Sequence, residues 1–170
     1  TVNRVRPTFN ERRMTQHMHA DVAFDRVLHI AHSEWHGIRQ CTAYAPGQKL
    51  LIPAESPLGA DILEIEETLA PVVREVERLG ITHVIFQGYS ENADLLLLRL
   101  KAAFGPDLRC FAVNHVTVAQ FEHTFEMSML ARLLTRLRLG LLSGIASVKQ
   151  NFGLAFEGFW PGVIMNFAPN

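Results

Sequence analysis

His115 is the side chain of this sequence whose type and position best suit acid–base chemistry. It directly follows residues 108–114, an apolar run with the composition of a buried strand. A histidine at the end of such a strand can act as a base or hydrogen-bond an anionic or sugar ligand. A structural role, in which His115 caps the start of a helix, fits the same position. We therefore take His115 as the candidate catalytic residue and keep the structural alternative open.

Polar residues also follow three other apolar runs, and ligands of parallel α/β sheets bind at such strand ends. At the first, Gly37 could bring backbone N–H groups close to a ligand, and Arg39 could pair with an anionic group. A plain turn between a strand and a helix explains the same residues without a ligand. The candidate binding residues at these strand ends are His36, Gly37, Arg39, Ser90, Asn114, Ser147 and Lys149.

Several well-known catalytic and binding motifs are missing from the sequence. Residues 32–39 contain one glycine, which excludes the dinucleotide fingerprint and the Walker loop, and no Gly-x-Ser-x-Gly elbow occurs. His32 and His36 flank Glu34, but a zincin helix places its glutamate directly after the first histidine. His17 and His19 have no carboxylate or thiolate that the sequence places beside them. The chain is therefore expected to hold neither a metal nor a tightly bound nucleotide phosphate.

Composition and charge set the class of protein. The chain has 170 residues, of which 48% are hydrophobic and 19% charged, which indicates a folded domain rather than a disordered polymer. The net charge of −1 gives no overall attraction to nucleic acid. Cys41 and Cys110 do not form a Cys-x-x-Cys pair, and both are expected to be buried free thiols in a reducing, cytoplasmic compartment.

Apolar runs and helical patterns alternate along the chain. Strands are expected at 26–32, 48–53, 82–88, 108–114, 141–148 and 162–167, and helices at 61–79, 91–104, 118–138 and 150–156. Residues 33–39 are expected to form a polar loop, and residues 1–25 a polar N-terminal arm. Because strands alternate with helices, neighbouring strands should be parallel. Residues 26–170 are thus predicted to form a doubly wound, Rossmann-like α/β domain, with a mostly parallel sheet and helices on both faces.

The stretch 127–138 forms a basic amphipathic pattern. Leu130, Leu133 and Leu137 fall on one helical face, and Arg132 and Arg136 are one turn apart. The leucines could pack against the sheet while the arginines face solvent. Alternatively, the helix could rest on an anionic membrane surface.

Four local features together carry a resemblance to a known family. They are the glycine segment 36–39 after the first strand, the stretch 84–90 at a middle strand, His115 at the end of the fourth strand, and residues 145–149 followed by 163–167. In this order the layout of residues 26–170 resembles the N-terminal, acceptor-side domain of a GT-B glycosyltransferase. That family frequently has two adjacent glycines in its first loop, where this chain has Gly37 alone.

The resemblance implies half of a hexosyltransferase-like enzyme of polysaccharide biosynthesis. Such an enzyme moves a sugar from a nucleotide-sugar, its co-substrate, to a glycan or lipid-linked acceptor, and it needs no metal or other cofactor. His115 would orient or deprotonate the acceptor. The donor would bind mainly to a C-terminal domain beyond this sequence, so the isolated half should be inactive. Its setting would be the cytoplasm, with peripheral contact at the inner membrane face through the helix that carries Arg132.

Other classes of function remain open at this stage. The main alternative is a non-catalytic α/β domain that binds a ligand or another protein, and a weaker one is a small α/β hydrolase or epimerase. If the chain continues beyond Asn170 into a second alternating pattern, we expect the sugar-transfer reading to hold. If the chain ends there, we expect the binding domain instead.

Overall fold

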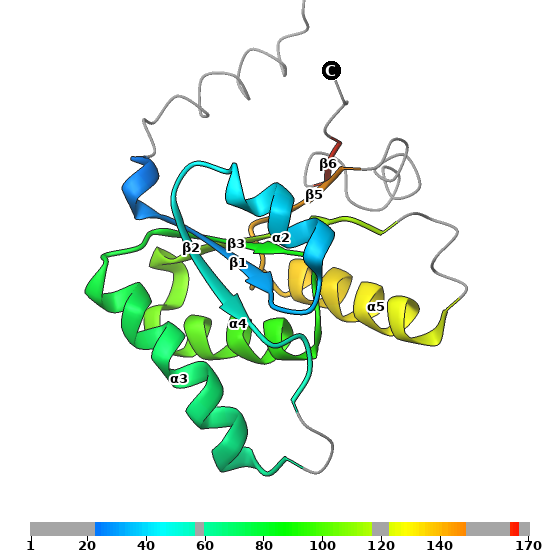
Figure 1. The fold of residues 1–170 in the computed structure, drawn as a ribbon, viewed down its shortest axis with the longest axis horizontal. Coiled ribbons are helices and arrows are strands. Elements are labelled where there is room, and N and C mark those ends of the chain that lie inside the picture. The colour runs from blue at the N-terminus through cyan, green and yellow to red at the C-terminus, as the bar shows by residue number, and fades with distance from the viewer. Residues whose placement is uncertain (1–22, 57–59, 117–122, 149–163, 167–170) are drawn as a thin grey trace, which may run out of the picture.

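The computed structural model describes residues 23–56, 60–116, 123–148 and 164–166 (Figure 1). The strands are β1 (Val27–His32), β2 (Gln48–Ile52), β3 (His83–Gln87), β4 (Arg109–Asn114), β5 (Gly144–Ser147) and β6 (Ile164–Asn166). The helices are α2 (His36–Ala43), α3 (Ile62–Arg78), α4 (Glu91–Phe104) and α5 (Thr124–Arg138), with short 3-10 turns at Phe24–Arg26 and Gly105–Asp107. The expected N-terminal arm up to residue 22, the helix at 150–156 and Lys149 lie outside the described residues.

The six strands form one sheet in the order β2-β1-β3-β4-β5-β6, and every neighbouring pair is parallel. The chain runs from β1 outward to β2 and then crosses β1 to β3, so the direction of winding reverses between β1 and β3. This arrangement confirms the predicted doubly wound, Rossmann-like α/β fold. It also brings the carboxyl ends of all six strands to one edge of the sheet.

The strand register divides the sheet into two faces. Leu28, Val84 and Cys110 are register partners in neighbouring strands, so they share a face with the other buried residues two positions along each strand. On this face α3, α4 and α5 supply the rest of the apolar core, including Leu69, Leu96, Leu97, Leu100, Leu133 and Leu137. Helix α2 lies on the opposite face, over β1 and β3 (Figure 1). Helices thus cover both faces, as the sequence predicted.

Helix α3 begins with a complete capping box, which explains its sharp start. The Asp61 carboxylate accepts from the backbone N–H of Leu63 and of Glu64, at 2.8 and 3.0 Å, and the Glu64 side chain accepts from the Asp61 N–H. The helix continues through Pro71 as a single element. Leu69, Val72 and Val76 are buried as an amphipathic face requires, whereas Ile62 in the first turn is 70% exposed.

Two local expectations from the sequence were wrong. Residues 36–39 are not a loop but the first turns of α2, which starts without a side-chain cap and without an acidic residue in its first turn. Those are the signals by which a helix start is usually found in a sequence. Cys110 is buried as expected, but Cys41 on α2 is exposed.

Candidate functional site

A polar residue ends each of the neighbouring strands β4 and β5 on the core face of the sheet. Asn114 at the end of β4 is the register partner of Ser147 at the end of β5, and Ser147 is the partner of Asn166 on β6. Asn114 is half-buried and donates from Nδ2 to the carbonyl of Val116 at 2.9 Å. Ser147 is fully buried. The structure therefore brings together Asn114 and Ser147, which the sequence had placed only at separate strand ends.

On the opposite face, two histidines and a glutamine form a chain of hydrogen bonds across three strands. His29 Nε2 on β1 lies 3.0 Å from the carbonyl oxygen of Pro46. His29 Nδ1 lies 3.0 Å from Gln87 Nε2 at the end of β3. Gln87 Oε1 in turn lies 3.2 Å from His115 Nε2, just beyond β4. His29 is buried, and Gln87 and His115 are half-buried.

His115 therefore lies where the sequence placed it, at the carboxyl end of β4, with one ring nitrogen held by a neighbouring strand. Burial lowers the pKa of His29, against the opposing effect of the Pro46 carbonyl, so His29 is neutral at neutral pH. A neutral His29 can hold the Gln87 amide in one orientation, and that amide in turn contacts His115. The catalytic role of His115 stays a prediction.

The point where the winding reverses, between β1 and β3, is filled by an aromatic side chain. The Trp35 indole lies against the His32 ring, with centroids 4.0 Å apart and ring planes tilted by 40°, and it also lies against Gly88. Gly88 has a φ of +87°, and a Cβ there would be 2.4 Å from the Trp35 ring. Ligands of doubly wound sheets usually bind in the crevice at this point. In this protein the indole occupies that space.

Ser90 lies below this tryptophan and is a structural residue. It is the N-cap of α4, and its Oγ accepts from the Ala93 N–H at 3.2 Å and lies 2.7 Å from His32 Nε2. Both Ser90 and His32 are fully buried. The Ser90–His32 pair resembles a nucleophile and base, but no acidic group binds the other nitrogen of His32 and no substrate could reach the hydroxyl. Ser90 is thus a buried helix cap in this arrangement, and its contact with a ligand stays a prediction.

Burial lowers the pKa of His32 to about 4, and the nearby Gln87 carbonyl and Glu34 carboxylate only partly oppose this effect. His32 Nδ1 is buried and has no partner within hydrogen-bond geometry among the described residues. His32 is therefore a neutral histidine of the core rather than a metal ligand or a base.

The three predicted binding residues of α2 lie at the same edge of the sheet but make different contacts. His36 and Gly37 are exposed, and a Cβ on Gly37 would meet no atom within 4 Å. Arg39 is half-buried and donates to the carbonyl of Ser33 at 3.2 Å and to His36 Nδ1 at 3.1 Å. Gly37 therefore has no steric need to be glycine. Arg39 stabilises the turn that leads from β1 into α2.

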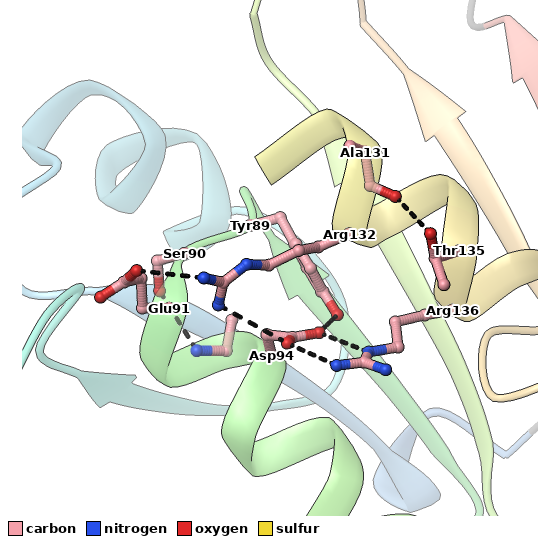
Figure 2. A network of polar contacts seen from close by, with 9 residues as sticks. Tyr89, Ser90, Glu91, Asp94, Ala131, Arg132, Thr135 and Arg136 are labelled. Carbon is pink, nitrogen blue, oxygen red and sulfur yellow. Dashed lines mark hydrogen bonds and ion pairs between the residues drawn. The ribbon is translucent and has the colours of Figure 1, made fainter. Parts of the chain in front are cut away.

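A buried ion pair fixes α5 against α4 (Figure 2). Arg136 donates to both carboxylate oxygens of Asp94 at 2.9 Å, and Tyr89 Oη donates to the same carboxylate at 2.7 Å. Burial alone would raise the pKa of Asp94, but the bonds from Arg136 and Tyr89 outweigh it and hold that pKa below its usual value. Asp94 is 2% exposed, so this pair works in a poorly solvated environment.

Arg132 reaches the same cluster from the preceding turn of α5. Its guanidinium lies 3.4 Å from the Glu91 carboxylate and 3.9 Å from that of Asp94 (Figure 2). The alternative in which both arginines face solvent is therefore wrong for Arg136, whose side chain is 22% exposed, whereas the Arg132 side chain is still 41% exposed. The sequence did not show it because the acidic partners lie on α4, more than 40 positions earlier.

With α5 held in this way, a small pocket forms between it and the strand ends. Its lining includes Tyr89, Asn114 and Glu126, together with apolar side chains of α5. Burial raises the pKa of Glu126, while the nearby His123 acts in the opposite direction. Glu126 is a polar group of this pocket that the sequence analysis did not select, since it lies inside a helix rather than at a strand end.

Two general tests for a site were negative over the described part of the chain. Residues 23–56, 60–116, 123–148 and 164–166 contain no group of three or more histidine, cysteine, aspartate or glutamate side chains that could hold a metal ion. Among the helices that the structure describes, none is both long enough and apolar enough to cross a membrane. His17 and His19 lie outside these residues.

No family model, curated protein or solved structure matches this chain. The likeness to GT-B enzymes therefore rests on the sequence features given above, and the roles of individual residues rest on their geometry. That geometry also shows what the sequence could not. Gln87 and His29 belong to the site because the register brings them together, and no local pattern in the sequence connects residues 58 positions apart.

Proposed function

We propose that this chain is the acceptor-side half of a glycosyltransferase and that His115 is its catalytic base. One observation carries the proposal: a histidine at the carboxyl edge of a parallel sheet is hydrogen-bonded through Nε2 to Gln87. A base that is oriented by a neighbouring side chain is typical of general acid–base catalysis. The doubly wound fold supports the proposal, since its ligands bind at this edge.

In the proposed reaction the acceptor hydroxyl gives its proton to Nδ1 of His115. The hydroxyl oxygen then forms a bond to the anomeric carbon of the donor sugar. The bond between that carbon and the phosphate oxygen breaks, and the nucleotide leaves with the electron pair. The nucleotide-sugar is a co-substrate, and we propose that a second domain outside this chain binds it. Metal or cofactor chemistry is not part of the proposal.

The acceptor would lie over the ends of β3, β4 and β5, because the other end of the edge is occupied. Trp35 fills the space between β1 and β3, and Ser90 is buried beneath it. Asn114 and Glu126 line the small pocket beside α5, and Arg39 and the exposed His36 lie on the helix that follows β1. A glycan acceptor suits these amide, carboxylate and imidazole groups, since all of them hydrogen-bond to hydroxyls.

A lipid-linked acceptor receives less support from the structure. The membrane contact was proposed for the basic face of α5, and two of its arginines are paired with acidic groups of α4. Arg138, in the last turn of that helix, is exposed. We therefore propose a soluble glycan in preference to a lipid-linked one.

The test has two stages, because the isolated half is expected to bind but not to react. First, ¹⁵N-labelled chain is titrated with glucose, N-acetylglucosamine and their disaccharides. We expect amide shifts at Asn114 and His115, and none at Arg26 or Asp107 on the opposite edge. Shifts at Arg26 and Asp107 alone, or no shift with any sugar, would contradict the proposal.

Second, His115→Ala is compared with His123→Ala in a protein that contains both halves. We expect His115→Ala to lower kcat by about 10²–10⁴-fold, with a smaller effect on KM, and the exposed His123 to be dispensable. If sugars bind at the β4 end but neither variant changes turnover, the non-catalytic ligand-binding domain becomes the better conclusion.

A further inference from the structure

We infer that Gln87 and His29 are positioning residues that set the tautomer of His115. The inference deepens the proposed function, on which it rests for its meaning, but the contacts themselves are independent of any substrate. They run from the carbonyl of Pro46 through His29 and Gln87 to His115, with distances of 3.0, 3.0 and 3.2 Å. Each hydrogen bond fixes the donor and acceptor of the next one, because the Pro46 carbonyl at one end can only accept.

The carbonyl oxygen of Pro46 is the fixed end, since a carbonyl can only accept a hydrogen bond. His29 Nε2 must therefore carry a hydrogen and donate it. In a neutral imidazole the second nitrogen then has the lone pair and must accept. His29 Nδ1 accordingly accepts from the group that faces it, which is the side-chain nitrogen of Gln87.

This requirement orients the amide of Gln87. With its nitrogen toward His29, its oxygen Oε1 faces His115. An amide oxygen accepts and does not donate, so His115 Nε2 must carry a hydrogen. The nitrogen of His115 that can take up a proton is then Nδ1, whichever group it contacts. When it does so, the bond to Gln87 becomes charge-assisted and stronger, which favours the imidazolium.

The fixed end is held in place by the backbone around it. Gly47, the residue after Pro46, has a φ of +116°, and a Cβ there would lie 2.8 Å from the carbonyl oxygen of Val27. The turn between α2 and β2 is thus packed closely on the start of β1. The residue before Pro46 donates its N–H to the carbonyl of Thr42 at 3.0 Å. The carbonyl that sets the direction of the hydrogen bonds is therefore not free to rotate away.

The reverse arrangement would disable the base. If the Gln87 amide turned over, its nitrogen would face His115 Nε2, which would have to accept. The hydrogen of neutral His115 would then be on Nδ1, where it could only donate. The structure thus gives Gln87 and His29 a role that is lost when either cannot hold the amide in one orientation.

The test is a ¹H–¹⁵N long-range correlation spectrum of the histidine rings in the labelled 170-residue chain, recorded near neutral pH without substrate. A ring nitrogen with a hydrogen and one without it have well-separated ¹⁵N shifts. His115→Gln and His29→Gln assign the two rings by loss of their signals. In the wild type we expect both His115 and His29 as the Nε2–H tautomer.

Two variants then remove the link in different ways. Gln87→Leu removes the amide oxygen that faces His115 Nε2 and should lower the share of the Nε2–H tautomer of His115. Gln48→Leu, at an exposed glutamine of β2, should leave the spectrum of His115 unchanged. Gln87→Glu offers only acceptor oxygens, so His29 should gain a hydrogen on Nδ1 as well and show two protonated nitrogens. His83→Gln, on the same face but outside the chain of contacts, should not change His115.

An Nδ1–H tautomer of His115 in the wild type, or an unchanged His115 in Gln87→Leu, overturns the inference. If Gln87→Leu does not fold, Gln87→Glu decides, because it predicts a doubly protonated His29 and a singly protonated one contradicts it. These spectra do not depend on catalysis. A correct tautomer together with full turnover in His115→Ala would overturn the proposed function alone.

Discussion

Side chains of each strand alternate between the two faces of the sheet, and the two faces differ in what those side chains do. On the face covered by α3, α4 and α5, Leu28, Phe86 and Cys110 are fully buried. On the face covered by α2, the neighbouring positions carry His29, Gln87 and a half-buried Phe111. One face therefore stabilises the fold, and the other holds titratable rings in a hydrogen-bonded chain. A single strand contributes to both, since its side chains alternate.

The two faces also treat charge differently. The apolar face contains a carboxylate, Asp94, which is matched by the bidentate Arg136 and by Tyr89. The other face has no such pair in the chain of contacts and instead links two histidine rings through an amide. A matched ion pair is fixed in charge, whereas an imidazole can take up a proton and release it again near neutral pH. The comparison explains why we look for chemistry on the α2 side.

The largest effect should come from the apolar face itself. Phe86→Ala removes a fully buried ring and should lower the free energy of unfolding by about 3–5 kcal/mol. Phe111→Ala, in the next strand but on the other face, removes a half-buried ring and should cost roughly 1–2 kcal/mol. Urea denaturation of both variants measures the difference. Equal losses would show that the two faces do not differ in stability.

The next largest loss of unfolding free energy should come from the ion pair of Asp94 and Arg136 on the apolar face. Asp94→Ala leaves Arg136 and Tyr89 without their acceptor and should cost about 3 kcal/mol. Glu91→Ala, which removes the exposed partner of Arg132, should cost less than about 1 kcal/mol.

The same pair predicts an acid dependence of stability. Because the folded pKa of Asp94 is below its unfolded value of about 3.9, its contribution is present above that value. The contribution is lost as the pH falls through the folded pKa. Denaturation of wild type and Asp94→Ala should therefore converge in strong acid, and a constant gap between them at every pH would contradict this account.

Protonation of His32 should have a smaller effect at any one pH. Its pKa is about 4 when folded and 6.5 as a reference, so the folded state favours the neutral ring. The contribution of the neutral His32 ring to the free energy of unfolding is fully present above pH 6.5. It is lost as the pH falls from 6.5 toward 4, by up to about 1.4 kcal/mol per pH unit. His32→Gln should remove this part of the acid dependence. His36→Gln, at an exposed histidine, is the matched control. If both variants change the acid dependence of stability equally, burial of His32 is not its cause.

Two glycines at the edge of the sheet should give the smallest effects, with opposite signs. Gly88→Ala places a Cβ against Trp35 at a positive φ and should cost about 1–3 kcal/mol. Gly37→Ala adds a Cβ in open space within a helix and should stabilise by up to about 1 kcal/mol. Thermal unfolding compares them. A loss of stability in Gly37→Ala would contradict the conclusion that this position has no steric need for glycine.

Much of the fold was predictable, because the signals are local. Helix α4 has the bounds that the sequence indicated, with Ser90 as an N-cap and Gly105 at its end. Strands β1 to β4 are apolar runs bounded by polar or turn residues. Helix α2 was missed because it has eight residues, includes Gly37, and begins without a capping side chain. Such a helix forms where the tertiary structure allows it, and its own sequence gives little sign of it.

The site was predictable only in part, since register and packing are not local. The position of His115 and Asn114 at the end of β4 was predicted because the strand end is visible in the sequence, and their roles in a site stay predictions. Gln87 was not found, because its role depends on the alignment of β3 with both β1 and β4. The contacts of Ser90 and Arg136 were not predicted for the same reason. Ser90 is hydrogen-bonded to His32, and Arg136 is paired with Asp94, and both partners come from other elements.

The close contact of Trp35 with His32 gives the protein an internal fluorescent reporter. A protonated imidazole quenches indole fluorescence much more strongly than a neutral one, and these two rings are 4.0 Å apart. Because His32 stays neutral down to a pH of about 4, the emission of Trp35 should remain bright over the neutral range and fall only in acid. The chain has two tryptophans, so Trp160→Phe isolates this signal. A molecule that displaces the indole from Gly88 should then change the wavelength and intensity of the Trp35 emission, so its binding can be followed without a label.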